Sequence, residues 1–130
     1  DRSVRLAIEA ENQGAFGVVV NAPISDEVIS RIKQVVDIPV IATIVSERMD
    51  IRSRMEAGAD FLNVSGAAAT PQIVRSIRTQ FPDVPILATG GPNDETILKT
   101  IRAGANAITY SPPSNGELFA DIMQKYRGKL

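Results

Sequence analysis

The stretch Asp37-Ile38-Pro39-Val40-Ile41-Ala42-Thr43 returns 46 positions later as Asp83-Val84-Pro85-Ile86-Leu87-Ala88-Thr89. Each copy is a short apolar run behind a proline, which is typical of a buried strand. Gly-Ala pairs alternate with these copies, at Gly14-Ala15, Gly58-Ala59 and Gly104-Ala105. Spacing this regular indicates a repeated unit of two strands and two helices. Strands that alternate with helices of this length pair in parallel, and such sheets bind ligands at the carboxyl ends of their strands.

The strand and helix signals along the chain support this repeat. The expected strands are short segments rich in β-branched residues, at residues 16–21, 40–45, 61–65, 86–89 and 107–111. Between them, apolar residues recur three and four positions apart in helical segments that start near Val28, Ile51, Ile73, Ile97 and Leu118. Residues 2–12 predict a further helix, whose preceding strand is absent. Gly58 and Gly104 stand where helices end in a left-handed residue.

These elements predict an α/β fold made of parallel βα repeats of the TIM-barrel type, with five strands present. Two architectures fit: a partial barrel that covers the last five strands of a (β/α)8 barrel, or an open doubly wound sheet. Residues 1–130 are expected to form a single α/β domain, since 130 residues of which 44% are hydrophobic suit one core. We expect this domain to be the C-terminal part of a barrel, completed by a missing N-terminal segment or by another chain in a homo-oligomer.

The composition excludes several classes of function. The chain has no cysteine and no histidine, which removes disulfides, thiolate nucleophiles and the usual general base and metal ligand. Its net charge of −1 gives no long-range attraction to nucleic acid or to an anionic membrane, and no apolar run is long enough to cross a bilayer. We therefore expect a cytoplasmic protein with no metal, no cofactor, and neither a nucleic acid nor a membrane as its partner.

The strongest candidate for a binding site is Thr89-Gly90-Gly91-Pro92, between a predicted strand and a predicted helix. Glycines let the backbone approach a ligand and turn its amides toward an anion, and the amino terminus of a helix adds partial positive charge. The next strand ends in Thr109-Tyr110-Ser111, and barrels commonly bind phosphate with their last two strand-to-helix loops. We predict that a phosphate or carboxylate group is bound by Thr89, Gly90, Gly91, Tyr110 and Ser111. A tight turn without a ligand is the alternative.

A ring of polar side chains is expected at the same end of the sheet. Asn63 and Ser65 point to one side of their strand, because side chains alternate along it. Polar groups in a strand that is buried on both faces need partners, and a pocket supplies them. Asn21, Thr43 and Thr89 occupy comparable late positions in their own strands. These residues are predicted to contact the ligand, with ordinary strand-end caps as the alternative.

Few residues are placed to act as catalysts. Glu47 directly follows the second expected strand and is therefore the candidate acid or base, with a solvated carboxylate at the start of a helix as the alternative. Enolisation assisted by Glu47 and Asn63 is the most concrete mechanism that the sequence suggests. A Schiff base requires a desolvated lysine near the strand ends, and none is expected there. The lysines fall on helices or on the tail, at Lys33, Lys99, Lys125 and Lys129.

The segment Phe-Pro-Asp-Val-Pro-Ile-Leu-Ala-Thr-Gly-Gly at 81–91 resembles the Phe-Pro-x-Val stretch that runs into Pro-Thr-Gly-Gly in 2-keto-3-deoxy-6-phosphogluconate / 4-hydroxy-2-oxoglutarate aldolases. Residues 38–41 are similar to that family's Ile-Pro-Val-Ile strand, and residues 58–62 to the approach to its catalytic strand. The resemblance covers 14–111. It implies a (β/α)-barrel fold, lyase activity, and a phosphate grip made by Gly90, Gly91 and Ser111.

The chain also departs from this family. Asn63 stands where the aldolases place their Schiff-base lysine, and the family's catalytic glutamate belongs to an early strand without a counterpart here. The resemblance therefore implies an aldolase-like scaffold without an imine-forming lysine, so it leaves open whether the chain is an enzyme. Residues 114–118, Ser-Asn-Gly-Glu-Leu, are similar to the ending of glycerol-uptake antiterminator regulators, which implies a non-catalytic sensor as the alternative. Both resemblances agree with binding of a small phosphorylated or carboxylated metabolite at the carboxyl ends of the strands.

Overall fold

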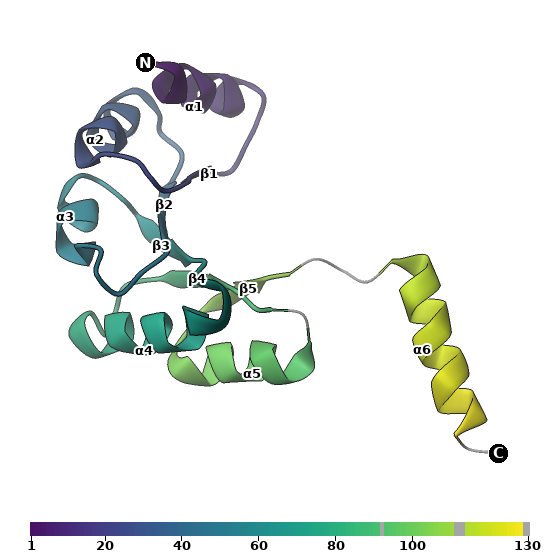
Figure 1. Cartoon of the computed structure of the whole chain (residues 1–130). Helices are drawn as coiled ribbons and strands as arrows, with labels where there is room; N and C mark the ends of the chain where they lie inside the picture. Colours follow the sequence, from purple (N-terminus) through teal and green to yellow (C-terminus); the bar gives the residue numbers. More distant parts are fainter. Residues whose placement is uncertain (92, 111–113, 129–130) are drawn as a thin grey trace.

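A computed structural model describes residues 1–91, 93–110 and 114–128. Its centre is one sheet of five parallel strands, which lie side by side in the order of the sequence (Figure 1). The strands are β1 (Val18–Val20), β2 (Val40–Ile44), β3 (Phe61–Val64), β4 (Ile86–Thr89) and β5 (Ala107–Thr109). All five coincide with the predicted segments, and most are a residue or two shorter.

Five helices line one side of the curved sheet, and a sixth stands apart from it (Figure 1). The helices are α1 (Arg2–Asn12), α2 (Asp26–Val35), α3 (Ile51–Glu56), α4 (Thr70–Gln80), α5 (Asp94–Ala103) and α6 (Asn115–Arg127), with a short 3-10 turn η1 (Ala67–Ala69) before α4. Every residue of α6 is exposed. Among the described helices, none has the length and apolar character needed to cross a membrane.

The strand order decides between the two predicted architectures. A doubly wound sheet reverses its strand order at a switch point and carries helices on both faces. Here the order is sequential, and α1 to α5 lie on one face (Figure 1). The fold is therefore of the TIM-barrel type, as predicted, and the doubly wound alternative is wrong.

Burial alternates along the strands. The side chains that point toward the helices form the core together with residues of α2 and α4: Val40, Ala42, Ile44, Leu62, Val64, Ile86 and Ala88 from the strands, and Ile29, Ile32, Ile73, Val74 and Ile77 from the helices. The alternate side chains lie on the opposite face, which we call the open face, and Val19 there is 52% exposed. No described element covers the open face, so the expectation that the strands are buried on both faces holds only at Thr43, which is 5% exposed, and is wrong for the other described open-face residues of the strands.

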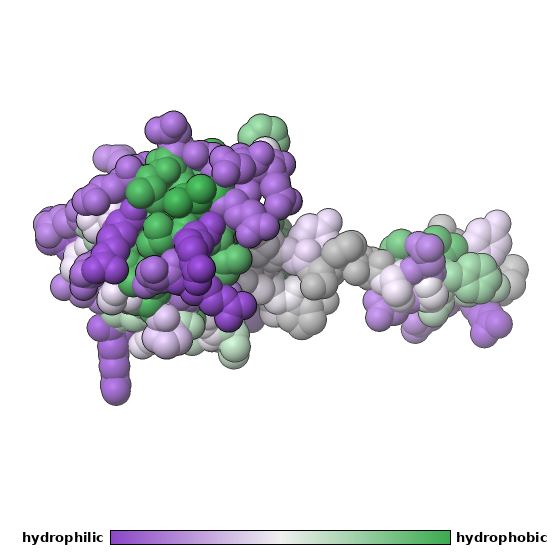
Figure 2. Space-filling view, turned by 90° about the horizontal axis from the view of Figure 1, so that it is seen from above, coloured by the Kyte–Doolittle hydropathy of each residue, from purple (hydrophilic) through white to green (hydrophobic). Residues whose placement is uncertain are grey.

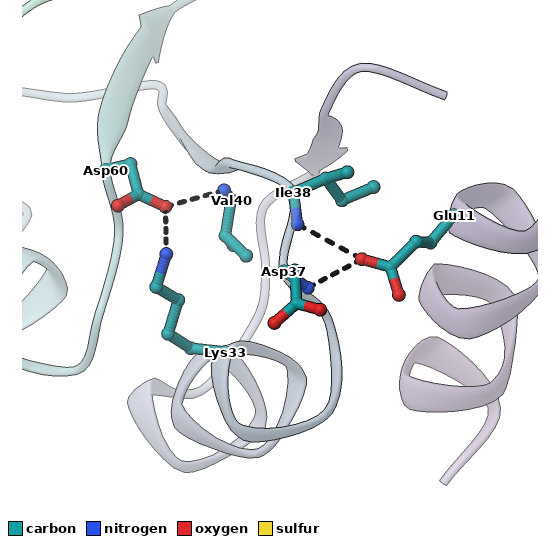
Figure 3. Close-up of polar contacts among 6 residues, drawn as sticks. All are labelled: Glu11, Lys33, Asp37, Ile38, Val40 and Asp60. Carbon is teal, nitrogen blue, oxygen red and sulfur yellow. Dashed lines mark hydrogen bonds and ion pairs between the residues drawn. The ribbon is translucent and has the colours of Figure 1, made fainter. Parts of the chain in front are cut away.

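A hydrogen-bonded clamp holds the amino ends of β2 and β3 (Figure 3). The carboxylate of Asp60, directly before β3, accepts a hydrogen bond from the backbone N–H of Val40 at 2.9 Å and one from Lys33 Nζ at 2.6 Å. Val40 is fully buried, so this N–H has no access to water. The clamp therefore joins α2, the start of β2 and the start of β3 in one contact.

The second repeat carries the same clamp. Asn106 Oδ1, directly before β5, accepts from the N–H of Ile86 at 2.9 Å and from Arg78 Nη2 at 2.7 Å. Asn106 follows Asp60 by 46 positions, and Ile86 follows Val40 by the same number. The sequence repeat is thus also a repeat of contacts, in which an amide replaces a carboxylate.

Glycines make room for the basic side chains of both clamps. Gly58 and Gly104 are left-handed, with φ of +119° and +118°, as predicted. A Cβ at Gly58 would lie 2.8 Å from Lys33 Cγ, and one at Gly104 would lie 3.0 Å from Arg78 Cγ. Each glycine therefore provides both a backbone turn and the space for the stem of the clamp's cation.

The helix at the amino end of the chain is held by a separate contact. Glu11 Oε2, in the last turn of α1, accepts from the backbone N–H groups of Asp37 at 2.6 Å and Ile38 at 3.1 Å (Figure 3). Asp1 begins the same helix by accepting from the N–H of Ser3 at 2.7 Å. These bonds fix α1 to the segment that leads into β2, at the same end of the sheet as the clamps.

The clamp predicts that two substitutions of Asp60 differ. Asp60→Ala leaves the buried N–H of Val40 without an acceptor and is expected to lower the free energy of unfolding by about 1–3 kcal/mol. Asp60→Asn keeps the acceptor that Asn106 supplies in the second repeat and loses only a partly exposed ion pair, so we expect a loss below about 1 kcal/mol. Urea denaturation measures both. Equal losses would show that the ion pair, and not the N–H acceptor, matters at this position.

Candidate functional site

A row of polar side chains crosses the open face of the sheet. Asn21 follows β1, Thr43 lies in β2, and Asn63 in β3 is the register partner of Thr43. Thr43 Oγ1 donates to Asn21 Oδ1 at 3.4 Å, and Asn63 Nδ2 donates to Thr43 Oγ1 at 3.4 Å. The structure therefore brings together three of the predicted residues, and their contact with a ligand stays a prediction.

The open face carries no charge of its own. The residues of the described strands that alternate with the buried set are Val19, Ile41, Thr43, Phe61, Asn63, Leu87, Thr89, Ala107 and Thr109. None of these residue types has a titratable side chain. An acid, a base or a cation near this face must therefore come from the loops and helices around it.

A cavity of about 500 Å³ lies beside the paired glycines. Its walls are the η1 turn and the start of α4, the end of β4 with its loop, and α5, through Ala67, Ala68, Thr70, Pro71, Thr89, Gly90, Gly91, Thr96, Lys99 and Thr100. Pockets for small ligands have volumes of roughly 300–1,000 Å³. This cavity contains three predicted residues and one cation, and it is the best candidate for a binding site.

The two glycines of the loop have different roles. The N–H of Gly90 donates to the carbonyl oxygen of Thr109 at 2.9 Å, which extends the pairing of β4 with β5. A Cβ at Gly90 would lie 2.5 Å from Ile108 Cγ2 and 2.8 Å from Ile97 Cγ1, so the glycine is required where α5 packs on the sheet. The prediction that the Gly90 amide binds the ligand is corrected, because that amide already belongs to the sheet.

Gly91 remains as the backbone donor of the loop. Its φ is +82°, and a Cβ there would lie 2.6 Å from Thr96 Oγ1. Among the described residues, no hydrogen bond of the Gly91 amide is found. A glycine in this left-handed conformation brings the main chain close to the cavity without a side chain in between.

The threonine hydroxyls of the cavity wall are partly used by the backbone. Thr70 Oγ1 accepts from the N–H of Gly66 at 2.9 Å, while Thr96 and Thr100 donate to carbonyl oxygens of the preceding turn at 2.8 and 2.9 Å. Each of these hydroxyls keeps further hydrogen-bonding capacity, because a hydroxyl has one donor and two acceptor sites. They therefore hold the wall in place and can still contact a ligand.

Lys99 is a residue of the cavity that the sequence analysis missed. As predicted, Lys99 lies on a helix and is not desolvated, with 61% of its side chain exposed, but it also lines the cavity with Thr89 and Gly90. Its Nζ lies 3.3 Å from Glu95 Oε1 in an exposed pair one helical turn apart, which is a weak constraint. The signal was present in the sequence, since Lys99 stands in the second turn of the helix that follows the glycine loop.

Glu47 and Asn63 are not brought together. Glu47 is exposed after β2, and its Oε2 accepts from Gln72 Nε2 at 3.4 Å. It lines a separate cavity of about 290 Å³ between α3 and α4, where the guanidinium of Arg52 lies 5.2 Å from the ring centroid of Phe81. This geometry turns Glu47 toward the helices and gives no support to joint catalysis with Asn63.

Two further predicted residues, Ser65 and Tyr110, lie at the same end of the sheet. Ser65 follows β3 and its N–H donates to the carbonyl oxygen of Ile44 at 2.9 Å, while Tyr110 follows β5 and is 60% exposed. Ser111 lies outside the described residues. Within the described part of the chain, no three histidine, cysteine, aspartate or glutamate residues are grouped as a metal ion requires.

Comparison with known proteins supports the fold. No protein-family model matches the chain, and no curated protein matches it. Among solved structures it is similar to native KDPGal aldolase, with 22% identity, a TM-score of 0.67, and coverage of 84% of this chain and 52% of that one. A mandelate oxidase variant with a monooxide FMN adduct gives 22% identity and a TM-score of 0.65, over 84% of this chain and 44% of that one.

These likenesses place the chain in one fold class. A designed cube-shaped protein cage is also similar, with 22% identity and a TM-score of 0.67 over 82% of this chain and 39% of the other. The chain thus spans about half the length, or less, of the structures it matches. It has the parallel βα repeat of TIM-barrel proteins, in an arrangement similar to that of KDPGal aldolase.

The polar row predicts that Asn63 is not needed for stability. Asn63→Leu replaces a half-buried amide on a face that already carries Ile41 and Leu87, so we expect the free energy of unfolding to stay within about 0.5 kcal/mol or to rise. Thermal and urea unfolding measure the change. A loss above about 1 kcal/mol would show that the row serves the fold and would remove Asn63 from the candidate site.

Proposed function

We propose that this chain binds a small phosphorylated or carboxylated metabolite at the carboxyl ends of its strands. The observation that carries this proposal is the 500 Å³ cavity, which combines the Gly91 main chain, the first turn of α4 and the cation Lys99. Each of these favours a negative charge. The polar row of Asn21, Thr43 and Asn63 would contact the uncharged part of the ligand across the open face.

The electrostatics of the cavity favour an anion of small size. The amino terminus of α4 has no side-chain cap, so its partial positive charge favours an anion, while Thr70 N–H already donates to the carbonyl oxygen of Ala67 and Pro71 has no N–H. The amino terminus of α5 is capped by Asn93, which accepts from the N–H of Thr96 at 3.0 Å, and therefore contributes less. Lys99 supplies a full charge that Glu95 only partly offsets, because both side chains are mostly exposed.

Binding without catalysis is the form of this function that the geometry favours. The described strands supply no ionisable side chain to the open face, and Glu47 is turned toward α4. General acid–base chemistry needs such a group within hydrogen-bond reach of the reacting atoms. Two forms of the proposed function therefore use the same anion site: a non-catalytic sensor, which the geometry favours, and an aldolase-like lyase.

A charge-only comparison at Gly91 tests the anion site. Gly91→Asn and Gly91→Asp have nearly the same shape and both tolerate a positive φ, so the strain against Thr96 is common to the two variants. We expect Gly91→Asp to bind inorganic phosphate and a phosphorylated 2-keto-3-deoxy sugar acid at least about tenfold more weakly than Gly91→Asn, measured by calorimetry, since tenfold is about 1.4 kcal/mol. Equal affinities would rule out an anion at this loop.

Borohydride trapping separates the lyase from the sensor. A Schiff base forms on a lysine that is desolvated, and the side chain of Lys99 is 61% exposed. We therefore expect no covalent adduct by mass spectrometry after incubation with the phosphorylated 2-keto acid and borohydride. Turnover without trapping would support a lyase that uses no imine, and an adduct on Lys99 would contradict the expectation.

A further inference from the structure

Apolar groups of this molecule lie both on an open surface and inside a cavity. Figure 2 shows the open surface from above, as an apolar area bordered by hydrophilic residues. The second set lies in the cavity of about 500 Å³, where Ala67, Ala68 and Pro71 belong to the wall formed by η1 and the start of α4. The wall of the cavity also contains the cation Lys99. The cavity can therefore contact both the anionic part and the apolar part of one ligand.

Ala67 has an unusual backbone conformation for a residue with a side chain. Its φ is +53°, in the left-handed region. An L-residue is strained there, because its Cβ lies too close to the following carbonyl oxygen. The other described residues with positive φ are all glycines, namely Gly14, Gly58, Gly91 and Gly104. Strained residues of this kind cluster at active sites and in segments that hold ligands.

The hydrogen bonds of the turn fix Ala67 in this conformation. The N–H of Gly66 donates to Thr70 Oγ1 at 2.9 Å, and the N–H of Ala69 donates to the carbonyl oxygen of Gly66 at 3.0 Å. The N–H of Thr70 donates to the carbonyl oxygen of Ala67 itself. None of these three bonds uses the side chain of Ala67, so a glycine at this position would allow all of them.

The methyl group of Ala67 adds nothing to the hydrophobic core. Ala67 is exposed, and it belongs neither to the buried cluster nor to the partly buried side chains that pack against this cluster. It does line the cavity. The contacts among the described residues thus give no reason for a strained alanine at this position, whereas a contact with a ligand gives one.

The two walls of the cavity offer different chemistry. Gly91 in the loop and Lys99 in α5 provide a backbone amide and a cation, and both favour an anion. On the side of η1, the N–H of Thr70 is already used and Pro71 has no N–H, so the methyl group of Ala67 and the ring of Pro71 provide apolar contacts. An anionic group that is attached to carbon fits both walls. A free inorganic anion leaves the apolar wall without a contact.

We propose that Ala67 determines the specificity of this cavity, because its methyl group contacts the carbon that carries the anionic group of the ligand. The cavity then prefers an anion attached to carbon, such as the phosphate monoester of a primary alcohol, over inorganic phosphate. This inference rests on the proposed function, since it requires that the anion is bound by Gly91 and Lys99.

Two ligands and one substitution test the role of Ala67. The wild-type protein should bind ethyl phosphate at least about fourfold more tightly than inorganic phosphate, which is the factor expected for one buried methylene group. Ala67→Gly should reduce this preference to less than about twofold and leave the affinity for inorganic phosphate unchanged. It should also raise Tm by about 2–4 °C, because the strain that it releases exceeds the entropic cost of a glycine. NMR titration at a pH at which both ligands are dianions measures the affinities, and thermal unfolding measures Tm.

Ala69→Gly is the matched control. Ala69 lies in the same turn with an ordinary φ of −84°, and it is not among the described residues that line the cavity. We expect this variant to bind both ligands as the wild type does. If it loses the preference for ethyl phosphate as Ala67→Gly does, the flexibility of the turn and not the methyl group is responsible, and the proposal is overturned.

The remaining outcomes separate this inference from the proposed function. If the wild type binds neither ligand, the anion site is absent and both proposals fail. If the wild type binds the two ligands equally, or if Ala67→Gly keeps the preference for ethyl phosphate, the anion site stands and the role of Ala67 is overturned. A lower Tm of Ala67→Gly would show that the methyl group serves the fold, which would also overturn it.

Discussion

The buried N–H that begins β2 is the constraint on which much of this structure depends. Val40 is fully buried, and the acceptor for its N–H comes from Asp60 at the start of the next strand. Asn106 does the same for Ile86. Each bond joins the amino ends of two neighbouring strands, so it sets their register as well as removing an unpaired donor from the core. A cation from the preceding helix completes each clamp.

This arrangement places the stabilising contacts and the candidate binding site at opposite ends of the strands. The clamps and the contact of Glu11 lie at the amino ends, whereas the polar row and the 500 Å³ cavity lie toward the carboxyl ends. Residues at the carboxyl ends of the strands can therefore differ in chemistry while the clamps keep the register of the strands. That freedom is the physical reason why loops at this end of βα repeats carry ligands.

A sheet with helices on one face alone leaves surfaces without partners. The open face, the edge of β1 and the exposed apolar side chains of α6 are all consequences of five sequential strands that do not close on themselves. The clamps stabilise the amino ends of the strands, and no described element covers these three surfaces. The charged groups of α6 interact with one another. The side chain of Asp121, one turn earlier in the same helix, accepts a hydrogen bond from Lys125, and this bond and its negative charge raise the pKa of Lys125 above its usual value.

Local sequence alone determined the strand–helix repeat and the left-handed turns at Gly58 and Gly104, because apolar spacing and backbone sterics act over a few residues. It also indicated the glycine loop, beside which the structure has a cavity of about 500 Å³. Only the tertiary structure decided that the Gly90 amide belongs to the sheet, that Lys99 lines the cavity and that Glu47 turns toward α4. These outcomes depend on how each helix is rotated against the sheet, which contacts between distant residues determine.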